Sequence, residues 1–289
     1  MDAIERTAAL PCFDNPQEIA PLGGGITNIN LSVRDGDRRF VVRLGADIDE
    51  HGVMRWNELA LSRAAEAAGI SPAVVHAEPG VLVLDFVDGK TYAEEDVRDP
   101  SNLPRILSLV SRAHRELGQH LRGPVLTFWP FQVVRTYARR LAEDGTSHAG
   151  ELPGLMKEAD ALEAATGPVE LVIGHNDLLA ANLIDDGTRI WLIDWEYGGF
   201  NSPLFDLAGL AGNNGLSEAQ ERAMLETYFD APAEARWRPY QAMKCISLMR
   251  ETLWSMTSEI HSELDFDYAA YTAENLARLR ATLSDFRNA

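Results

Sequence analysis

The chain is poor in cysteine and has no long apolar run, and both shortages limit what it can be. Its two cysteines, Cys12 and Cys245, lie far apart and lack the spacing of metal ligands, so we expect two reduced thiols. No apolar run approaches the roughly 20 residues that span a bilayer. The first residues, MDAIERTAALPCF, lack the basic start and apolar core of a signal peptide. We therefore expect a cytoplasmic protein that does not insert into membranes.

Positive charge is also scarce. Among 289 residues, 26 Lys and Arg stand against 44 Asp and Glu, which gives a formal net charge of −18. Proteins that bind nucleic acid need basic patches to neutralise phosphates, so the charge argues against a nucleic-acid partner. It favours capture of a small cation, although many cytosolic proteins are acidic without binding one.

The first third of the chain predicts a small sheet with one helix. Residues 29–44 and 72–87 each contain two apolar runs around a turn with glycine, which is typical of β-hairpins. Between them, residues 55–69 have the apolar spacing of a helix, and Gly69 is placed to end it.

Helical patterns dominate after residue 87. They cover residues 102–119, 131–142, 155–165 and 217 to the C-terminus, where Ser217 and Gln220 form a capping-box pattern. A strand pair, 169–173 with 190–193, interrupts the helices. We predict an α+β fold with a β-rich lobe at residues 1–87, a larger helical lobe at residues 88–289, and a cleft between them.

The segment GHNDLLAANLI carries the strongest chemical signal. It contains His175, Asp177 and Asn182 in the pattern His-x-Asp-Leu-x-x-x-Asn, the catalytic loop of kinases, with Asn176 where protein kinases have arginine. In that loop the aspartate accepts a proton from the attacking hydroxyl, and the asparagine reaches a Mg²⁺ on the nucleotide phosphates.

A second metal ligand is expected because Mg²⁺ usually takes a carboxylate. The run RIWLIDWEY places Asp194 after an apolar strand, and the turn DDGT before it predicts a hairpin that brings Asn182 and Asp194 to one site. Each of these residues, taken alone, is explained equally well as a turn cap. Turn capping does not explain all of them together, because a chance match to the kinase pattern arises in roughly one in several hundred chains of this length.

Phosphate-binding candidates lie upstream. Gly23, Gly24 and Gly25 precede the first hairpin and let backbone N–H groups approach a phosphate, although such a cluster alone is usually a flexible turn. No Gly-Lys-Ser/Thr follows, so this is not a Walker A loop. Arg43 occupies the strand position at which protein kinases have lysine, and Glu58 on the next helix is placed to pair with it. The alternative is a surface arginine on an edge strand.

In these motifs the chain resembles the choline/ethanolamine kinase group of the aminoglycoside-phosphotransferase-like kinases. The resemblance runs from about Leu22 to Tyr271 and is carried by GGGITNIN, GHNDLLAANLI, LIDWEYGGFNSPLFDLA and LWSMTSEIHSELDFDYAAY. It implies a bilobal protein-kinase-like fold that binds ATP and Mg²⁺.

The resemblance also implies roles for individual residues. Asp177 would be the catalytic base, and Asn182 and Asp194 the Mg²⁺ ligands. The nucleotide would contact the glycine loop, the residues after it, the arginine–glutamate pair, and a hinge whose backbone meets adenine: Gly24, Gly25, Thr27, Asn28, Arg43, Glu58, Asp85 and Phe86.

The acceptor in this group is a small cationic amino alcohol held by aromatic faces and carboxylates. The resemblance places Glu196, Tyr197, Glu251, Trp254, Phe266 and Tyr271 around it, whereas Tyr268 has the spacing of a core residue and Asp206 is expected to anchor the catalytic loop. Two positions depart from the group. Glu251 replaces a tryptophan, which would suit a less methylated amine, and Asn213 replaces an acid.

The sequence therefore predicts an ATP-dependent kinase that phosphorylates choline, ethanolamine or a related amino alcohol. Another acceptor on the same scaffold is the nearest alternative: an aminoglycoside, thiamine or a methylthioribose-like sugar. A non-catalytic pseudokinase is a further alternative, but it has no need of all three site residues. A protein kinase is disfavoured because no Ala-Pro-Glu follows Asp194. The oligomeric state and the pathway stay open.

Overall fold

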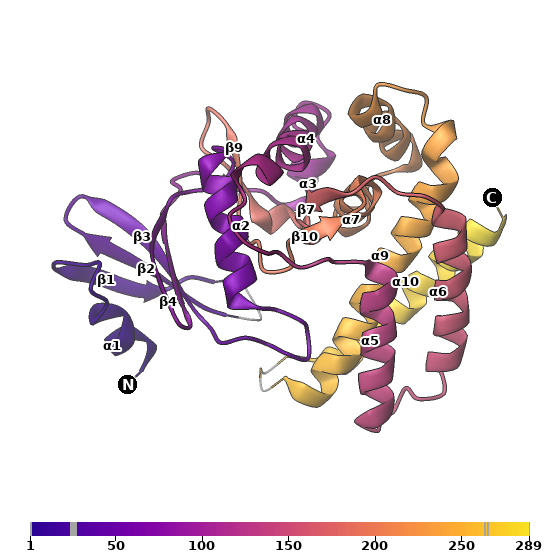
Figure 1. Ribbon diagram of the computed structural model, residues 1–289, viewed down its shortest axis with the longest axis horizontal. Helices are drawn as coiled ribbons and strands as arrows, with labels where there is room; N and C mark the ends of the chain where they lie inside the picture. The colour runs from indigo at the N-terminus through magenta and orange to yellow at the C-terminus, as the bar shows by residue number, and fades with distance from the viewer. Residues whose placement is uncertain (1, 24–27, 263, 265, 289) are drawn as a thin grey trace.

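The computed structural model describes residues 2–23, 28–262, 264 and 266–288. An antiparallel sheet lies at one end of the molecule and a group of helices at the other (Figure 1). The N-terminal elements are α1 (Ala3–Ala8), β1 (Pro16–Pro21), β2 (Ile29–Asp35), β3 (Arg38–Leu44), α2 (Arg55–Ala67), β4 (Val74–Glu78) and β5 (Val81–Asp85). The fold is the predicted α+β, kinase-like one.

The C-terminal part is mainly helical and contains short strands. Its elements are β6 (Lys90–Thr91), α3 (Glu94–Arg98), α4 (Leu103–His120), α5 (Pro130–Glu143), α6 (Leu152–Thr166), β7 (Val172–Gly174), the 3₁₀ turn η1 (Ala180–Asn182), β8 (Leu183–Asp185), β9 (Ile190–Leu192), β10 (Gly199–Asn201), α7 (Pro203–Asn214), α8 (Glu218–Phe229), α9 (Glu234–His261) and α10 (Tyr268–Asn288). No helix in the described part of the chain is long and apolar enough to cross a bilayer.

Both predicted hairpins form. The sheet has the order β1-β2-β3-β5-β4, and its two hairpin turns contain Gly36 (φ 60°) and Gly80 (φ 72°), which adopt the left-handed conformation that glycine favours. Strand β3 is therefore central, and alternation along it buries Phe40 and Val42 against α1 and sends Arg43 to the opposite face. The edge-strand alternative for Arg43 is wrong.

Two hydrophobic cores hold the molecule together. The smaller lies between the sheet and the N-terminal segment with α1, around Leu10, Leu31 and Val83. The larger fills the helical part and includes Leu61, Ala64 and Ala65 of α2. Helix α2 lies between the sheet and the other helices in Figure 1 and contacts α4. The lobe boundary at residue 87 stays a prediction; helix α2 shares the core of the part that follows it.

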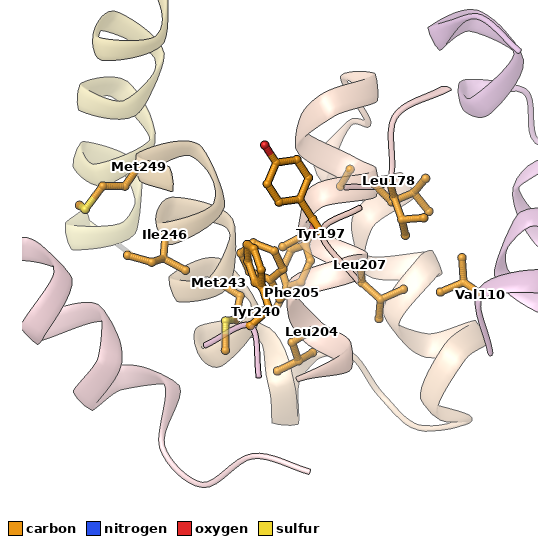
Figure 2. Close-up of a cluster of buried hydrophobic side chains, with 14 of the residues drawn as sticks. Val110, Leu178, Tyr197, Leu204, Phe205, Leu207, Tyr240, Met243, Ile246 and Met249 are labelled. Carbon is orange, nitrogen blue, oxygen red and sulfur yellow. The ribbon is translucent and has the colours of Figure 1, made fainter. Parts of the chain in front are cut away.

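Helix α9 is the spine of the helical part. It packs against α5, α6, α7 and α10 and carries two of the six predicted acceptor residues, Glu251 and Trp254. Figure 2 shows part of the core around α9, which includes Met243, Ile246 and Met249 of α9 and Leu204 and Phe205 of α7. Because these side chains are buried and close-packed, α9 is held in a fixed position relative to α7.

The predicted helices α4, α5 and α6 agree with the structure to within a few residues, and the capping box at Ser217 forms, with the Gln220 N–H donating to the Ser217 hydroxyl. One pairing is wrong: β7 pairs with β10, and β9 pairs with β8. Helix α7 was not predicted. Its residues from Pro203 to Ala211 are all buried, so it has no polar face and no amphipathic period to reveal it.

Candidate active site

A buried carboxylate shapes the loop that follows β7. Asp206, in the first turn of α7, accepts the backbone N–H groups of His175 and Asn176 at 2.7 Å each. His114 of α4 places its Nε2 2.8 Å from the same carboxylate and its Nδ1 2.6 Å from the Tyr228 hydroxyl. Burial would raise the pKa of Asp206, but His114 and His175 lower it below its ordinary value. The predicted anchoring role of Asp206 is confirmed.

His175 ties the loop to the end of β9. Its Nε2 donates to the Ile193 carbonyl at 2.8 Å, and its Nδ1 accepts the Asp177 N–H at 3.3 Å. Burial lowers the pKa of His175, so the ring is neutral and these two bonds define its tautomer. Asp177 is thereby fixed relative to Ile193, the residue before Asp194.

Asn182 completes the closure of the loop. Its side-chain nitrogen donates to the Asp177 carbonyl at 2.9 Å, and its own carbonyl accepts the Ile193 N–H at 3.0 Å. Asp194 has a positive φ of 70°, a conformation that aspartate tolerates better than most residues. As a result Asp177, Asn182 and Asp194 all line one cavity of about 670 Å³.

These residues fit a Mg²⁺ ion by the chemistry of their donors. The Asn182 nitrogen must face the Asp177 carbonyl, since a carbonyl only accepts, and this leaves the carboxamide oxygen for a ligand. Asp194 supplies a carboxylate of which one oxygen accepts from Arg43 at 2.9 Å. An amide oxygen and a carboxylate oxygen are ligands that Mg²⁺ prefers, with phosphates and water completing its shell.

Asp177 has an unusual electrostatic environment. Burial raises its pKa to about 7, and the neighbouring carboxylates of Glu251, Asp194 and Glu196 act in the same direction. Arg250 opposes them, with its Nη1 3.7 Å from Asp177 Oδ1. A carboxylate with a pKa near neutrality is suited to accept a proton and to release it again.

Arg43 is buried in a network of carboxylates. Its guanidinium lies 2.9 Å from Asp194, 3.3 Å from Glu58 and 3.5 Å from Glu196, so the predicted Arg43–Glu58 pair forms. Burial opposes the charge, but the three carboxylates raise the pKa of Arg43 above its ordinary value. Arg55, which the sequence did not single out, also bridges Glu58 and Glu196, at 2.7 and 3.2 Å.

Asn28, which follows Gly23, Gly24 and Gly25 in the sequence, contacts this network. Its side-chain nitrogen donates to Glu196 at 3.0 Å. Gly24, Gly25 and Thr27 lie outside the described residues. The roles of these positions in nucleotide binding therefore stay predictions.

A second group of side chains lines the same cavity on the side of α9 and α10. Tyr271 donates its hydroxyl to one oxygen of Glu251, and Arg250 Nη1 donates to the other, both at 2.8 Å. Trp254 Nε1 donates to the Tyr197 hydroxyl at 3.0 Å. Figure 2 shows the Tyr197 ring at the edge of the hydrophobic cluster, with its hydroxyl pointing away from it. Asn213 also lines the cavity.

Three of the predicted residues, Asp85, Phe86 and Phe266, lie apart from both the described lining of this cavity and the carboxylate network around Arg43. Phe266 is half exposed and contacts Tyr268 and Tyr271 through its ring. Asp85 pairs with Arg38, and the backbone N–H groups of Asp85 and Phe86 already donate to carbonyls within or beside the sheet. A contact of this hinge with adenine would have to use carbonyl groups or later residues. Tyr268 is buried, as predicted for a core residue.

A known protein family matches most of this chain. A family model described as "Phosphotransferase enzyme family" matches residues 18–243. The chain belongs to this family. The protein LicA of Haemophilus influenzae is 26% identical over 260 residues, which cover 85% of this chain and 75% of that protein. A probable ethanolamine kinase of Arabidopsis thaliana is 24% identical over 290 residues, which cover 89% and 77%.

Solved structures of the choline/ethanolamine kinase group have a fold similar to that of this phosphotransferase. A choline/ethanolamine kinase family protein from Mesorhizobium loti has a TM-score of 0.79 at 26% identity, covering 99% of this chain and 98% of that chain. The choline kinase LicA from Streptococcus pneumoniae has a TM-score of 0.80 at 22% identity, covering 97% of each. The resemblance to the choline/ethanolamine kinase group is confirmed.

Arg250, like Arg55, is a residue of the phosphotransferase site that sequence reasoning missed. It is 5% exposed and lies with its guanidinium 4.3 Å from the centre of the Tyr197 ring. The signal was present, since an Arg-Glu pair interrupts an otherwise largely apolar stretch, LMRETLWSM. An arginine at such a position is buried only when a carboxylate and an aromatic face are available to it.

Asp206→Ala should destabilise the protein strongly. The change leaves two buried N–H groups and the His114 ring without their acceptor, which costs about 3 kcal/mol or more of the free energy of unfolding. Urea unfolding of the variant measures this loss. Asp37→Ala, on the exposed β2–β3 turn, is the control; equal stability of the two variants would contradict the anchoring role.

The raised pKa of Asp177 predicts a dependence of stability on pH in the absence of metal and nucleotide. Folded protein binds this proton more tightly than unfolded protein, so the stabilisation is complete below about pH 4 and is lost as the pH rises through about 7. Relative to Asp177→Asn, wild type should lose up to about 1.4 kcal/mol per pH unit within this window.

Urea unfolding of wild type and Asp177→Asn at several pH values tests this dependence. Asp37→Asn, an exposed position, should give a curve parallel to wild type. If Asp177→Asn is also parallel to wild type between pH 4 and 7, the carboxyl does not have the raised pKa.

Proposed function

We propose that this phosphotransferase moves the γ-phosphoryl group of ATP to the hydroxyl of choline, ethanolamine or a related amino alcohol, and that it prefers amines that carry N–H groups. One observation supports the proposal most: Asp177, Asn182 and Asp194, which come from a bent loop and the hairpin after it, line one cavity with Glu251 and Trp254. Base, metal donors and a carboxylate for an amine are thus within one space.

Each residue has a distinct task in the proposed reaction. Asp177 orients the acceptor hydroxyl and takes its proton, and its pKa of about 7 suits that exchange near neutral pH. Asn182 and Asp194 would hold Mg²⁺, which neutralises charge on the phosphates. Arg43 keeps Asp194 in place and brings a fixed positive charge to the phosphate side.

The preference for an N–H amine is supported by what covers the aromatic faces. A trimethylammonium group cannot donate hydrogen bonds and depends on open aromatic faces. Here Arg250 covers one face of Tyr197, and His51 stacks on Trp254 with the ring centres 5.0 Å apart. Glu251, in contrast, offers a carboxylate that an ammonium N–H can reach, oriented by Tyr271.

The relatives support the acceptor class. The proteins that resemble this chain include a probable ethanolamine kinase and a probable choline kinase of Arabidopsis thaliana, each 24% identical, and together these names span primary and quaternary amines. Sequence identity of 24% does not specify which amino alcohol is the acceptor, so the proposed choice of acceptor depends on the residues of the pocket. Glu251 and Arg250 are therefore the positions on which the proposed preference depends.

Asp177→Ala should lower turnover by about 10²- to 10⁴-fold, because the acceptor hydroxyl loses its base. The affinity for ATP should change little, since the side chain faces the acceptor. Steady-state kinetics with ethanolamine and ATP measure both quantities. Asp37→Ala is the matched control. A variant that turns over at nearly the wild-type rate refutes the assignment.

Glu251→Trp should shift the preference from ethanolamine toward choline, because it replaces an ion-pair partner with an aromatic face. The ratio of kcat/KM for the two substrates is the measurement, and circular dichroism checks that the variant folds. Glu251→Gln separates charge from shape: it should weaken ethanolamine without improving choline. An unchanged ratio in both variants contradicts the proposed role of Glu251.

An acceptor panel distinguishes the rival substrates. Wild type is assayed for ATP consumption with choline, ethanolamine, their methylated intermediates, thiamine and an aminoglycoside. Activity confined to thiamine or the aminoglycoside replaces the amino-alcohol proposal while keeping the kinase. Absence of turnover with every acceptor, together with ATP binding, favours the pseudokinase reading.

A further inference from the structure

A second cavity lies on the other side of the Tyr197 ring. It has a volume of about 420 Å³ and is enclosed by the segment from Asp49 to Met54, the segment from Leu126 to Trp129, and the first turns of α5. Small-molecule sites in proteins occupy about 300–1,000 Å³, so this cavity is large enough for a ligand of its own. It shares Glu196 and Tyr197 with the acceptor cavity, but Asp177, Asn182 and Asp194 are not among its described lining residues.

Carboxylates line the cavity, and its described lining contains no lysine or arginine. Glu196 is already paired with Arg43 and Arg55 from outside the cavity, so Asp49 and Glu50 are the carboxylates that a cation would meet. The His51 ring also lines it, but burial lowers the pKa of His51 to about 3, so the ring is neutral at physiological pH. A ligand here meets Asp49 and Glu50 without a competing lysine or arginine among the described lining residues.

The walls of the cavity are aromatic and aliphatic. Phe128, Trp129, Tyr137 and Tyr197 contribute rings, and Val133 adds an aliphatic surface. These rings are held in place: Trp129 donates its Nε1 to Glu163 at 2.6 Å, and the Tyr137 hydroxyl lies 3.1 Å from His51 Nδ1. Fixed aromatic faces beside carboxylates attract organic cations with an apolar body.

The acceptor cavity is also lined by carboxylates, but it differs in its basic side chains. Lys244, Arg250 and Arg278 all line it, so its carboxylates share the space with protein cations. Three side chains lie between the two cavities. Trp254 donates a hydrogen bond to the Tyr197 hydroxyl, and the His51 ring stacks on Trp254. An organic cation with an apolar body therefore has a more favourable environment in this second cavity than in the acceptor cavity.

We propose that the cavity between Glu50, Val133 and Tyr197 is a second binding site, for an amphiphilic organic cation in which an ammonium group is attached to an aromatic or alkyl body. The ammonium lies near Glu50 and Asp49 at the mouth, and the apolar body lies against the ring faces and Val133. The site adjoins the acceptor cavity through Glu196 and Tyr197 but excludes Asp177 and the predicted metal ligands, and it does not depend on the identity of the acceptor.

Benzyltrimethylammonium is a suitable probe because it has the charge and the ring but no hydroxyl, so it is not a phosphoryl acceptor. Titration calorimetry on the full chain should show binding at millimolar concentration. Benzyl alcohol, which keeps the ring without the charge, should bind at least about tenfold more weakly. Equal binding of the two compounds, or no binding of the cation, overturns the proposal.

Variants of α5 locate the site. Val133→Trp fills the cavity, and Thr136→Lys adds a positive charge at its mouth; each should weaken the probe at least about tenfold. Ala142→Lys adds the same charge to an exposed position of the same helix outside the cavity and should bind like wild type. If Val133→Trp fails to fold by circular dichroism, Thr136→Lys with its control decides the outcome.

Glu251→Gln separates the two cavities. It alters the acceptor cavity alone, so the probe should keep its wild-type affinity. Loss of binding in Glu251→Gln, with binding intact in Thr136→Lys, would assign the probe to the acceptor cavity and overturn the proposal. None of these measurements requires turnover, so a failure of the proposed kinase activity would leave the result unchanged.

Discussion

The bond set around Asp206 is the constraint on which the site depends. Buried N–H groups must find acceptors, and the two that follow β7 find one carboxylate, which His114 holds from α4. This arrangement turns the chain sharply after Gly174 and directs Asp177 into the cavity. Strand pairing alone could not do so, because β7 is three residues long and, among the strands that the structure describes, pairs only with β10.

Charge in the site is balanced by buried arginines. Arg43 spans Asp194 and Glu58, and Arg250 lies between Asp177 and Glu251, so each guanidinium serves two carboxylates. A lysine would be a poorer substitute, because its compact ammonium lacks the planar fork that reaches two acceptors in fixed directions. The carboxylates still outnumber the arginines locally, and the raised pKa of Asp177 is one consequence.

The sequence predicted what depends on local pattern. Both hairpins, helix α2 and the meeting of Asp177, Asn182 and Asp194 follow from turn residues, periodicity and a loop too short to do otherwise. What it missed depends on distant partners. Helix α7 is buried all round, so it has no amphipathic stripe; β10 pairs with β7 across 25 residues; and Arg250 is buried because Tyr197 and Glu251 receive it.

The pairing of Arg250 with Glu251 shows why one position of the acceptor pocket cannot be interpreted alone. An uncompensated buried arginine costs several kcal/mol, so Glu251 stabilises Arg250 before it meets any ligand. Arg250 in turn covers the Tyr197 face that a methylated amine would need. The two residues therefore act together. Arg250 covers an aromatic surface, Glu251 supplies a carboxylate, and the pair as a whole has no net charge. This pairing is the physical basis of the proposed preference for amines that carry N–H groups over methylated amines.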